Sequence, residues 1–482
     1  MTRVACSGLL ALLLLSSTMV AGGQTMAADP VVSNADRIRP WSEKPRYWQY
    51  RGQPVLLVGG SREDNLFQIP DLEEQLDLLA SVGGNQIRNT MSDRDEGDVY
   101  PYAQLADGRY DLDQWNEEYW RRFAEMLRLT HERDIFVQIE VWDRFDLSDV
   151  REMGNWRRHP YRPANNVNYT GEQSGLADAY PDHPSADKHP FYHTVPGMDE
   201  YRAQYDLIRG YQERFVDRML EYSLPYGNVL YCMDNETSTD PRWGQYWMAF
   251  IKQRGAAAGL DVFVTDMFDD GWKPEQSDKI RLELDRPDLY DFIDISQVNS
   301  RNFGEDHWRR LRWVVEQVAA HPRPVTHTKI YSAGETSFGS GTPQDGVERF
   351  WRNLLGGSAS SRFHRPTAGI GINEIAQACI RSVRKAETLV RFWEIDAHME
   401  LLGEREENEA YLAADPGTAY VLFFCRGGAV KLDLTGLDGV FSGRWIDVTT
   451  GEWGAQFELI GGVPRPLAAP TEAPWVAVMT RP

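Results

Sequence analysis

The chain has few cysteines and no long apolar run, and both absences exclude whole classes of protein. Only four cysteines occur in 482 residues, and Cys6 lies within the first 28 residues, which leaves Cys232, Cys379 and Cys425. Three scattered cysteines give no disulfide framework, so stability must come from a buried apolar core. No stretch after residue 28 approaches the roughly 20 apolar residues of a membrane span.

Positive charge is also scarce. The chain has 51 Lys and Arg against 72 Asp and Glu, a formal net charge of −21. That excess argues against nucleic acid or an anionic membrane as a general partner. The sequence contains no Gly-rich phosphate loop and no Ser-His-Asp signature, and His183, His189 and His193 match no zinc spacing. We therefore predict no metal and no cofactor.

The first residues have the pattern of an export signal. Thr2-Arg3 supplies a basic start, Leu9–Leu15 an apolar segment, and small residues follow before residue 28. We predict that residues 1–28 are a signal peptide and that the mature protein is secreted or periplasmic.

Residues 29–400 alternate short apolar strands with amphipathic helices, the pattern of a (β/α)8 barrel. The eight expected strands are 55–60, 85–89, 135–142, 228–233, 262–265, 292–299, 324–329 and 360–364. The pattern changes near Glu400. From there to residue 482, short strands stand between Gly-rich turns, which predicts an antiparallel β-sandwich. The predicted fold class is thus α/β, a barrel followed by a small β-sandwich domain.

Polar residues at the carboxyl ends of barrel strands face one mouth, where such barrels carry their chemistry. Asp234, Asn235 and Glu236 follow the fourth expected strand. Paired carboxylates at this mouth suit the hydrolysis of glycosides, in which one protonates the leaving oxygen and the other attacks or activates water. We predict Glu236 as general acid/base, with Asn235 bonding a sugar hydroxyl.

The second carboxylate is less defined. Lys329 occupies the end of the seventh strand, and Glu335 is the nearest acid after it, with Gly334 allowing the chain to turn back. Glu335 is the predicted partner of Glu236. The rivals are Glu140, Asp143, Asp234 and Glu374.

Other strand-end residues are predicted to bind substrate. They are Arg88, Asn89, Trp142, Asp143, Asn299, His327, Lys329, Arg362, His364 and Arg365. Because arginine binds carboxylate or sulfate bidentately, this concentration of cations, with Arg301, suggests an anionic sugar such as a uronate or a sulfated residue. An alternative is that these cations neutralise the acids of the barrel mouth.

The sequence resembles clan A glycoside hydrolases, especially the apiosidase-like families, in which a barrel precedes a collagen-binding-type β-sandwich. The resemblance rests on Gly52–Gly59 (GQPVLLVG), Asn235-Glu236, and Trp445–Asp447 leading to Thr450–Glu452. It covers nearly the whole mature chain and implies a retaining hydrolase with Glu236 as acid/base. Where those families carry a Glu after strand seven, this chain has Lys329.

Two other functions stay open. A polysaccharide lyase would use Lys329 or a histidine to abstract a proton beside a uronate carboxylate held by arginine. A non-catalytic carbohydrate-binding barrel would keep the fold without the second carboxylate. The sequence does not fix the glycan, exo or endo action, or the oligomeric state.

Overall fold

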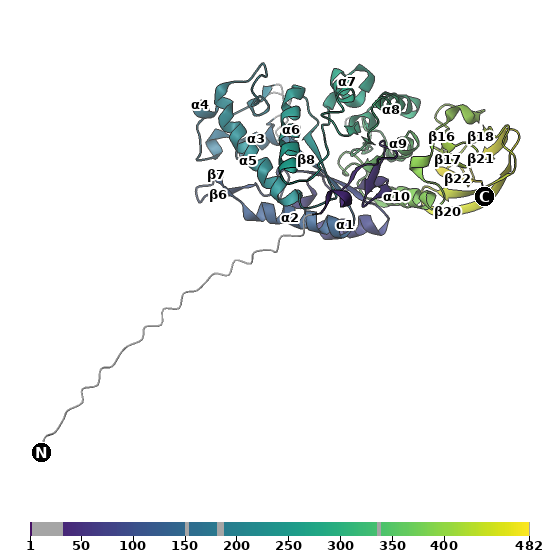
Figure 1. Ribbon diagram of the computed structural model, residues 1–482, viewed down its shortest axis with the longest axis horizontal. Coiled ribbons are helices and arrows are strands. Elements are labelled where there is room, and N and C mark those ends of the chain that lie inside the picture. Colours follow the sequence, from purple (N-terminus) through teal and green to yellow (C-terminus); the bar gives the residue numbers. More distant parts are fainter. Residues whose placement is uncertain (2–31, 150–153, 181–187, 335–338, 482) are drawn as a thin grey trace.

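The computed structural model describes residues 1, 32–149, 154–180, 188–334 and 339–481. Figure 1 shows a barrel of strands wrapped by helices, with a β-sandwich of C-terminal strands beside it, next to α9 and α10. The predicted fold class, a (β/α)8 barrel followed by a small antiparallel sandwich, is confirmed.

The barrel strands run parallel in the predicted order. They are β4 (Leu57–Gly60), β5 (Gln86–Thr90), β8 (Phe136–Asp143), β9 (Val229–Asn235), β10 (Val264–Thr265), β11 (Ile293–Asp294), β12 (Val325–Thr326) and β13 (Ser360–Phe363). Backbone hydrogen bonds close the ring where the strands are short. Asp291 N–H donates to Val264 O between β10 and β11, and Ala359 N–H donates to Val325 O between β12 and β13.

Glycine permits the closest strand approach in this ring. A Cβ at Gly59 in β4 would lie 1.9 Å from the backbone oxygen of Gln86 in β5. No side chain could occupy that space, so the pairing of β4 with β5 depends on glycine at this position.

Helices connect successive strands and cover the outside of the ring (Figure 1). They are α1 (Leu72–Ser81), α2 (Glu117–Glu132), α5 (Asp206–Ser223), α6 (Pro241–Ala257), α7 (Asp278–Asp285), α8 (Gly304–Val318), α9 (Pro343–Leu355) and α10 (Glu374–Glu387). In α2, the Asn116 side chain caps the start by accepting from Glu118 N–H. Phe123, Met126 and Thr130 recur on its buried face at helical spacing, which fastens α2 to the barrel.

Smaller elements frame the barrel. A three-stranded antiparallel sheet, β1 (Arg39–Pro40), β2 (Trp48–Tyr50) and β3 (Gln53–Val55), precedes β4. The hairpin β6 (Tyr102–Gln104) and β7 (Tyr110–Trp115) follows β5, and the short helices α3 (Asn155–Arg158) and α4 (Gly171–Ser174) follow β8.

Two barrel strands end several residues earlier than expected. The sixth was predicted over 292–299, but β11 ends at Asp294 and residues Ser296–Asn299 form a 3-10 helix. The seventh was predicted over 324–329, but β12 ends at Thr326. The side chains beyond these strands therefore do not follow strand alternation.

The C-terminal domain consists of two antiparallel sheets. One has the order β14-β16-β17-β22-β19-β20 and the other β15-β18-β21. Their bounds are β14 (Asp396–Ala397), β15 (Leu402–Gly403), β16 (Ala410–Asp415), β17 (Ala419–Phe424), β18 (Ala429–Leu432), β19 (Val440–Asp447), β20 (Glu452–Ile460), β21 (Arg465–Ala468) and β22 (Trp475–Thr480).

The larger of these sheets belongs to two apolar cores. Tyr420, Leu422 and Phe424 of β17 pack within the sandwich, whereas Val421 and Phe423 belong to the same core as the barrel. The Phe423 ring stacks on Trp351 of α9 with ring centroids 5.7 Å apart. Alternation along one strand thus joins both domains.

A buried polar cluster lies at the same boundary. Glu348 of α9 accepts hydrogen bonds from Arg352 Nη1 at 3.2 Å and from Asn408 Nδ2 at 3.0 Å. We call Glu348, Arg352 and Asn408 the barrel–sandwich contact. Within the described part of the chain, no helix is both long and apolar enough to cross a membrane.

Candidate active site

A cavity of about 480 Å³ opens at the carboxyl ends of the barrel strands. We call it the barrel-mouth pocket. Its lining includes Asp64, Arg94, Arg144, Phe145, Asn235, Glu236, Asp269, Trp272, Gln297, Arg301, Lys329, Tyr331, His364 and Arg365. Among the predicted site residues, Asn235, Glu236, Lys329, His364 and Arg365 lie in this pocket.

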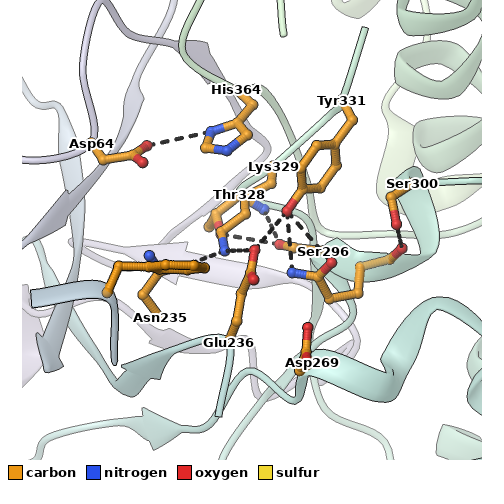
Figure 2. Close-up of polar contacts among 12 residues, drawn as sticks. Asp64, Asn235, Glu236, Asp269, Ser296, Ser300, Thr328, Lys329, Tyr331 and His364 are labelled. Carbon is orange, nitrogen blue, oxygen red and sulfur yellow. Dashed lines mark hydrogen bonds and ion pairs between the residues drawn. The ribbon is translucent and has the colours of Figure 1, made fainter. Parts of the chain in front are cut away.

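Glu236 is the carboxylate at the centre of the pocket (Figure 2). It follows β9 directly and has φ of 68°, a left-handed conformation that is uncommon outside glycine. Its Oε1 accepts from Lys329 Nζ at 3.0 Å and from the Tyr331 hydroxyl at 2.8 Å. Its Oε2 accepts from Arg144 Nη2 at 3.1 Å. The strained backbone thus holds the carboxylate against two cations and a phenol.

These contacts keep Glu236 ionised. Burial, the largest influence, would raise the pKa of Glu236, but Lys329 and Arg144, with hydrogen bonds from Lys329 and Tyr331, lower it well below its usual range. A general acid must carry a proton before reaction, whereas a nucleophile must not. An ionised Glu236 can attack a substrate atom or take up a proton, and its predicted role as general acid/base stays a prediction.

Lys329 and Tyr331 come from the segment after β12. They are two residues apart, so in an extended segment their side chains lie on one face. Lys329 Nζ also contacts Asn235 Oδ1, and Asn235 Nδ2 donates to Asp143 Oδ2 at 3.0 Å. Asn235 is therefore held on both sides, and its predicted contact with a sugar hydroxyl stays a prediction.

Arg144 links two carboxylates of the pocket. It follows β8 directly, its Nη2 contacts Glu236, and its Nη1 donates to Asp269 Oδ2 at 3.0 Å. Asp269 lies beyond β10, where Thr237 N–H donates to Met267 O and Asp269 N–H donates to Thr237 O. This pairing fixes Asp269 beside Glu236.

Asp64 is the second buried acid of the pocket wall, and cations surround it. Arg365 Nε lies 3.1 Å from Asp64 Oδ2, and Arg88 bonds Oδ1. Burial would raise the pKa of Asp64, but the guanidinium groups of Arg88, Arg365 and Arg94 hold it well below its usual range.

His364 is neutral in this wall. It lies 3.4 Å from Asp64 Oδ1 (Figure 2). Burial lowers the pKa of His364 well below its usual range, and Arg88 and Lys329 oppose the attraction of Asp64. The contact with Asp64 is therefore that of a neutral imidazole rather than an ion pair.

Asp143 lies under the pocket floor. Its side chain is fully buried and bonds Arg94, Phe145 N–H and Asn235 Nδ2. Asp143 was predicted to bind substrate and was a rival for the second carboxylate. With these partners it positions Asn235 and Arg94 and has no surface on the pocket.

The structure corrects the predicted substrate contacts of Arg88 and Arg362. Both side chains lie inside the barrel and are fully buried. Arg88 bonds Glu140 and Asp64, and Arg362 bonds Thr328 O and the Ser61 hydroxyl. Strand alternation points them into the ring below the mouth, where they satisfy buried polar groups.

Asn89 and Trp142 are also away from the pocket. Asn89 Oδ1 accepts from Phe67 N–H, a bond inside the fold. Trp142 packs against Trp247 of α6 and Phe215 of α5, with ring centroids 5.5 and 5.2 Å apart. A large indole gains more from burial between helices than from a place at the mouth.

Asn299 and His327 lie behind the pocket wall, because β11 and β12 end early. Asn299 Nδ2 and His327 Nδ1 are 3.0 Å apart, and His327 Nε2 is 2.9 Å from the Ser358 hydroxyl. Burial lowers the pKa of His327 to about 3, so the ring is neutral. Both residues join α8, α9 and β13 rather than contact a ligand.

The other candidate acids differ in how far they are buried. Glu140 and Asp234 are fully buried, and Glu374 is exposed at the start of α10. Glu335, the predicted partner of Glu236, lies outside the described residues. No group of three or more His, Cys, Asp or Glu side chains in the described segments is arranged to hold a metal ion.

Sequence reasoning missed Arg144, Asp269, Trp272 and Tyr331. Arg144 could have been found, since it directly follows the third strand, and Tyr331 stands two residues after Lys329. Asp269 and Trp272 lie in a 3-10 helix, Asp269–Trp272, four residues beyond the fifth strand. No periodic signal marks that segment.

No protein-family model matches the chain, and no curated protein matches it. Solved structures do. A glycoside hydrolase family 5 protein from Bacteroides vulgatus is 11% identical, with a TM-score of 0.60, and the match covers 93% of this chain and 95% of the other. A further glycoside hydrolase gives a TM-score of 0.61 at 11% identity over 92% and 97% of the two chains.

A maltogenic alpha-amylase from Thermotoga neapolitana is also similar. It gives a TM-score of 0.51 at 9% identity over 89% of this chain and 99% of the other. These three structures are two glycoside hydrolases and an amylase, and the matches cover 89–93% of this chain, which includes both domains. At these identities the likeness concerns the fold.

Proposed function

We propose that this protein is a glycoside hydrolase that cleaves glycosidic bonds of a polysaccharide or oligosaccharide. The observation that carries the proposal is Glu236, an ionised carboxylate at the end of the fourth barrel strand, held by Lys329 and Arg144 at the wall of a 480 Å³ pocket. Carboxylates that attack the anomeric carbon need such an environment.

Glu236 acts as the nucleophile. Its side chain is 16% exposed, whereas the side chains of Lys329 and Arg144 are 1% and 4% exposed. The oxygens therefore reach the cavity while the cations stay behind them. Tyr331 and Lys329 orient Oε1, which leaves the carboxylate in one geometry before substrate binds.

The substrate carries a carboxylate or sulfate group, and Arg301 binds it. Arg301 is exposed on the pocket lining, with φ of 59° and its guanidinium 5.5 Å from the Trp272 ring centroid. Among the described residues, no carboxylate is paired with it. Arginine in a strained backbone beside an aromatic ring suits recognition of an acidic sugar.

The activity is tested with a panel of uronides, sulfated glycosides, neutral glycosides and apiosides, scored by release of reducing ends. We expect turnover of charged glycosides. Products that absorb as unsaturated uronates would instead support a lyase, although Lys329, paired with Glu236, is not a free base. Binding of these sugars without any product would support the non-catalytic barrel.

The charge preference is tested with Arg301→Gln. One charged hydrogen bond contributes about 1.5–3 kcal/mol, so KM for charged substrates should rise about 10-fold or more and KM for neutral ones should not change. Arg309→Gln, on the exposed face of α8, is the matched control. An equal effect of Arg301→Gln on both substrate classes would end the anionic proposal.

Secretion or export to the periplasm is also proposed, from the basic start and the apolar segment Leu9–Leu15. The N-terminal sequence of protein recovered from outside the cytoplasm tests it, and a start near residue 29 is expected. Recovery of the protein from the cytoplasm, with Met1 still as its first residue, would contradict the proposal of export.

A further inference from the structure

Arg349 is a fully buried arginine in the middle of α9, and it does not line the barrel-mouth pocket. Because α9 follows β12 in the barrel, the helix begins at the mouth, and helical side chains tilt toward the start of their helix. The guanidinium therefore lies behind the pocket wall. In the part of the chain that the structure describes, every hydrogen bond that it donates goes to a backbone carbonyl oxygen.

These hydrogen bonds join two segments of the barrel mouth. Arg349 Nε and Nη2 donate to Asn302 O at 3.0 and 2.8 Å, and Nη1 donates to Tyr331 O at 2.6 Å and to Ser340 O. Asn302 lies beyond β11, whereas Tyr331 lies beyond β12. The pairing of β11 with β12 covers only two residues of each strand, so the guanidinium joins the two segments beyond it.

Each of the joined segments carries a residue of the pocket. Arg301 directly precedes Asn302, and the Tyr331 hydroxyl donates to Glu236 Oε1 at 2.8 Å (Figure 2). Asn302 Nδ2 also donates to Trp272 O at 2.7 Å, so the residue that Arg349 holds is bonded to the tryptophan beside Arg301. A shift of either carbonyl would therefore move a side chain that faces the pocket.

We propose that Arg349 is a positioning residue for two residues of the pocket, Arg301 and Tyr331. Through them it sets how the anionic group of the substrate is bound and how Glu236 is kept ionised. The inference rests on the proposed hydrolase with charged substrates, and it holds whether Glu236 attacks or takes up a proton. A guanidinium suits this task, because its donors point in fixed directions and reach three carbonyls at once. The Phe303 ring, 4.7 Å from Cζ, packs against the guanidinium.

Arg349→Met tests this role, because methionine keeps much of the apolar stem and removes every donor. We expect KM for charged glycosides to rise about 10-fold and KM for neutral ones to change little, since Arg301 is no longer held toward the substrate. The acid limb of kcat/KM should move to higher pH, because the ionised Glu236 loses the hydrogen bond from Tyr331. Steady-state rates on both substrate classes across pH measure the two effects.

Arg323→Met is the matched control. Arg323 is also buried, and among the described residues it too donates only to backbone carbonyl oxygens. Its Nη2 donates to Glu283 O at 2.6 Å and to Leu284 O at 3.0 Å, and its Nη1 donates to His321 O at 3.0 Å. It precedes β12, so it lies at the end of the barrel opposite the mouth. The control should lose stability as Arg349→Met does and keep the wild-type charge preference and pH profile.

The outcomes separate this inference from the hydrolase function. If wild type is active and Arg349→Met keeps its KM ratio and acid limb, the positioning role is overturned and the hydrolase function stands. Equal changes of both readouts in the control would also overturn it, because Arg349 would then only support the fold. If wild type cleaves no glycoside of the panel, both proposals fall.

Two further variants sharpen the test. If Arg349→Met does not fold, Arg349→Lys replaces it, because a single ammonium group cannot hold three carbonyls in fixed directions. Both readouts should then shift in the same directions, and wild-type values would overturn the role. In the Arg301→Gln background, Arg349→Met should cause no further loss of charge preference, because both changes remove one contact. Additive losses would contradict positioning of Arg301.

Discussion

Two buried carboxylates, Glu236 at the barrel mouth and Glu348 at the barrel–sandwich contact, have similar partners and different surroundings. Each accepts from arginine and from a neutral donor. The Glu348 side chain is 1% exposed and packed between domains, whereas the Glu236 side chain is 16% exposed and borders a cavity. Ion pairing alone therefore does not distinguish a candidate catalytic carboxylate from a structural one. Access to an open volume does.

The largest effect is expected from Glu236→Gln. Removal of the attacking carboxylate should lower kcat at least about 10³-fold, because the amide cannot form the glycosyl ester. The fold should persist, since glutamine keeps the shape of the side chain. Steady-state rates with circular dichroism as a check measure this. More than a tenth of wild-type activity in the variant would remove Glu236 from the reaction.

Glu348→Ala should have the opposite effect, a loss of stability with little change in activity. It leaves Arg352 buried without its carboxylate and should lower the free energy of unfolding by about 3–5 kcal/mol. The kcat of the folded protein should stay within about twofold of wild type. Glu316→Ala on the exposed face of α8 is the control, with an expected loss below about 1 kcal/mol. Urea unfolding gives both values, and a large change of kcat in Glu348→Ala would break the comparison.

Tyr331→Phe tests how much the Tyr331 hydroxyl contributes to the low pKa of Glu236. The phenol donates to Oε1 and so favours the ionised carboxylate. Its loss should raise the pKa of Glu236, since the charged form loses a donor. The acid limb of kcat/KM should then move to higher pH, and kcat should fall about 10-fold. A pH profile that stays in place would show that Lys329 and Arg144 alone set the charge of Glu236.

Asp266 provides a fourth, smaller test, because it is fully buried and has no ion-pair partner among the described residues. Burial, opposed by the Thr237 hydroxyl and Met267 N–H, raises the pKa of Asp266 to about 7. A carboxyl whose pKa is raised by folding contributes stability at low pH, and that stability is lost as pH rises from about 4 to 7. The stability of Asp266→Asn should therefore rise by about 2–3 kcal/mol relative to that of wild type between pH 5 and pH 8.

The control for this measurement is Asp278→Asn, whose side chain is 99% exposed. It should follow the wild-type pH dependence of unfolding. Parallel curves for Asp266→Asn and wild type would mean that Asp266 is ionised in the folded protein, and then burial without a cation would not explain the contrast with Glu236.

The fold could be predicted because its signals are local. Apolar runs such as 228–233 and the helical stripe of α2 are set by neighbouring residues, and their alternation determines the barrel. The pocket depends instead on where strands end. Lys329 and Glu236 were found from strand ends, but Asn299 and His327 were misplaced because β11 and β12 have only two residues each.

The direction of the side chains at strand ends was the second feature that the sequence could not predict. Trp142 and Arg144 stand two residues apart at the end of β8, yet the first packs against α6 and the second contacts Glu236. The partners of these two side chains decide this, and Trp247 and Glu236 both lie more than 90 positions later in the chain. No window of sequence around β8 contains that information.

The shared core at β17 makes each of the two domains depend on the other for the burial of apolar side chains. Val421 and Phe423 complete the barrel core, while Leu422 and Phe424 complete the sandwich core. A gene fusion or deletion that separates the two domains would leave an apolar sheet face and the Trp351 ring open to water. We therefore expect the two domains to fold and unfold as one cooperative unit.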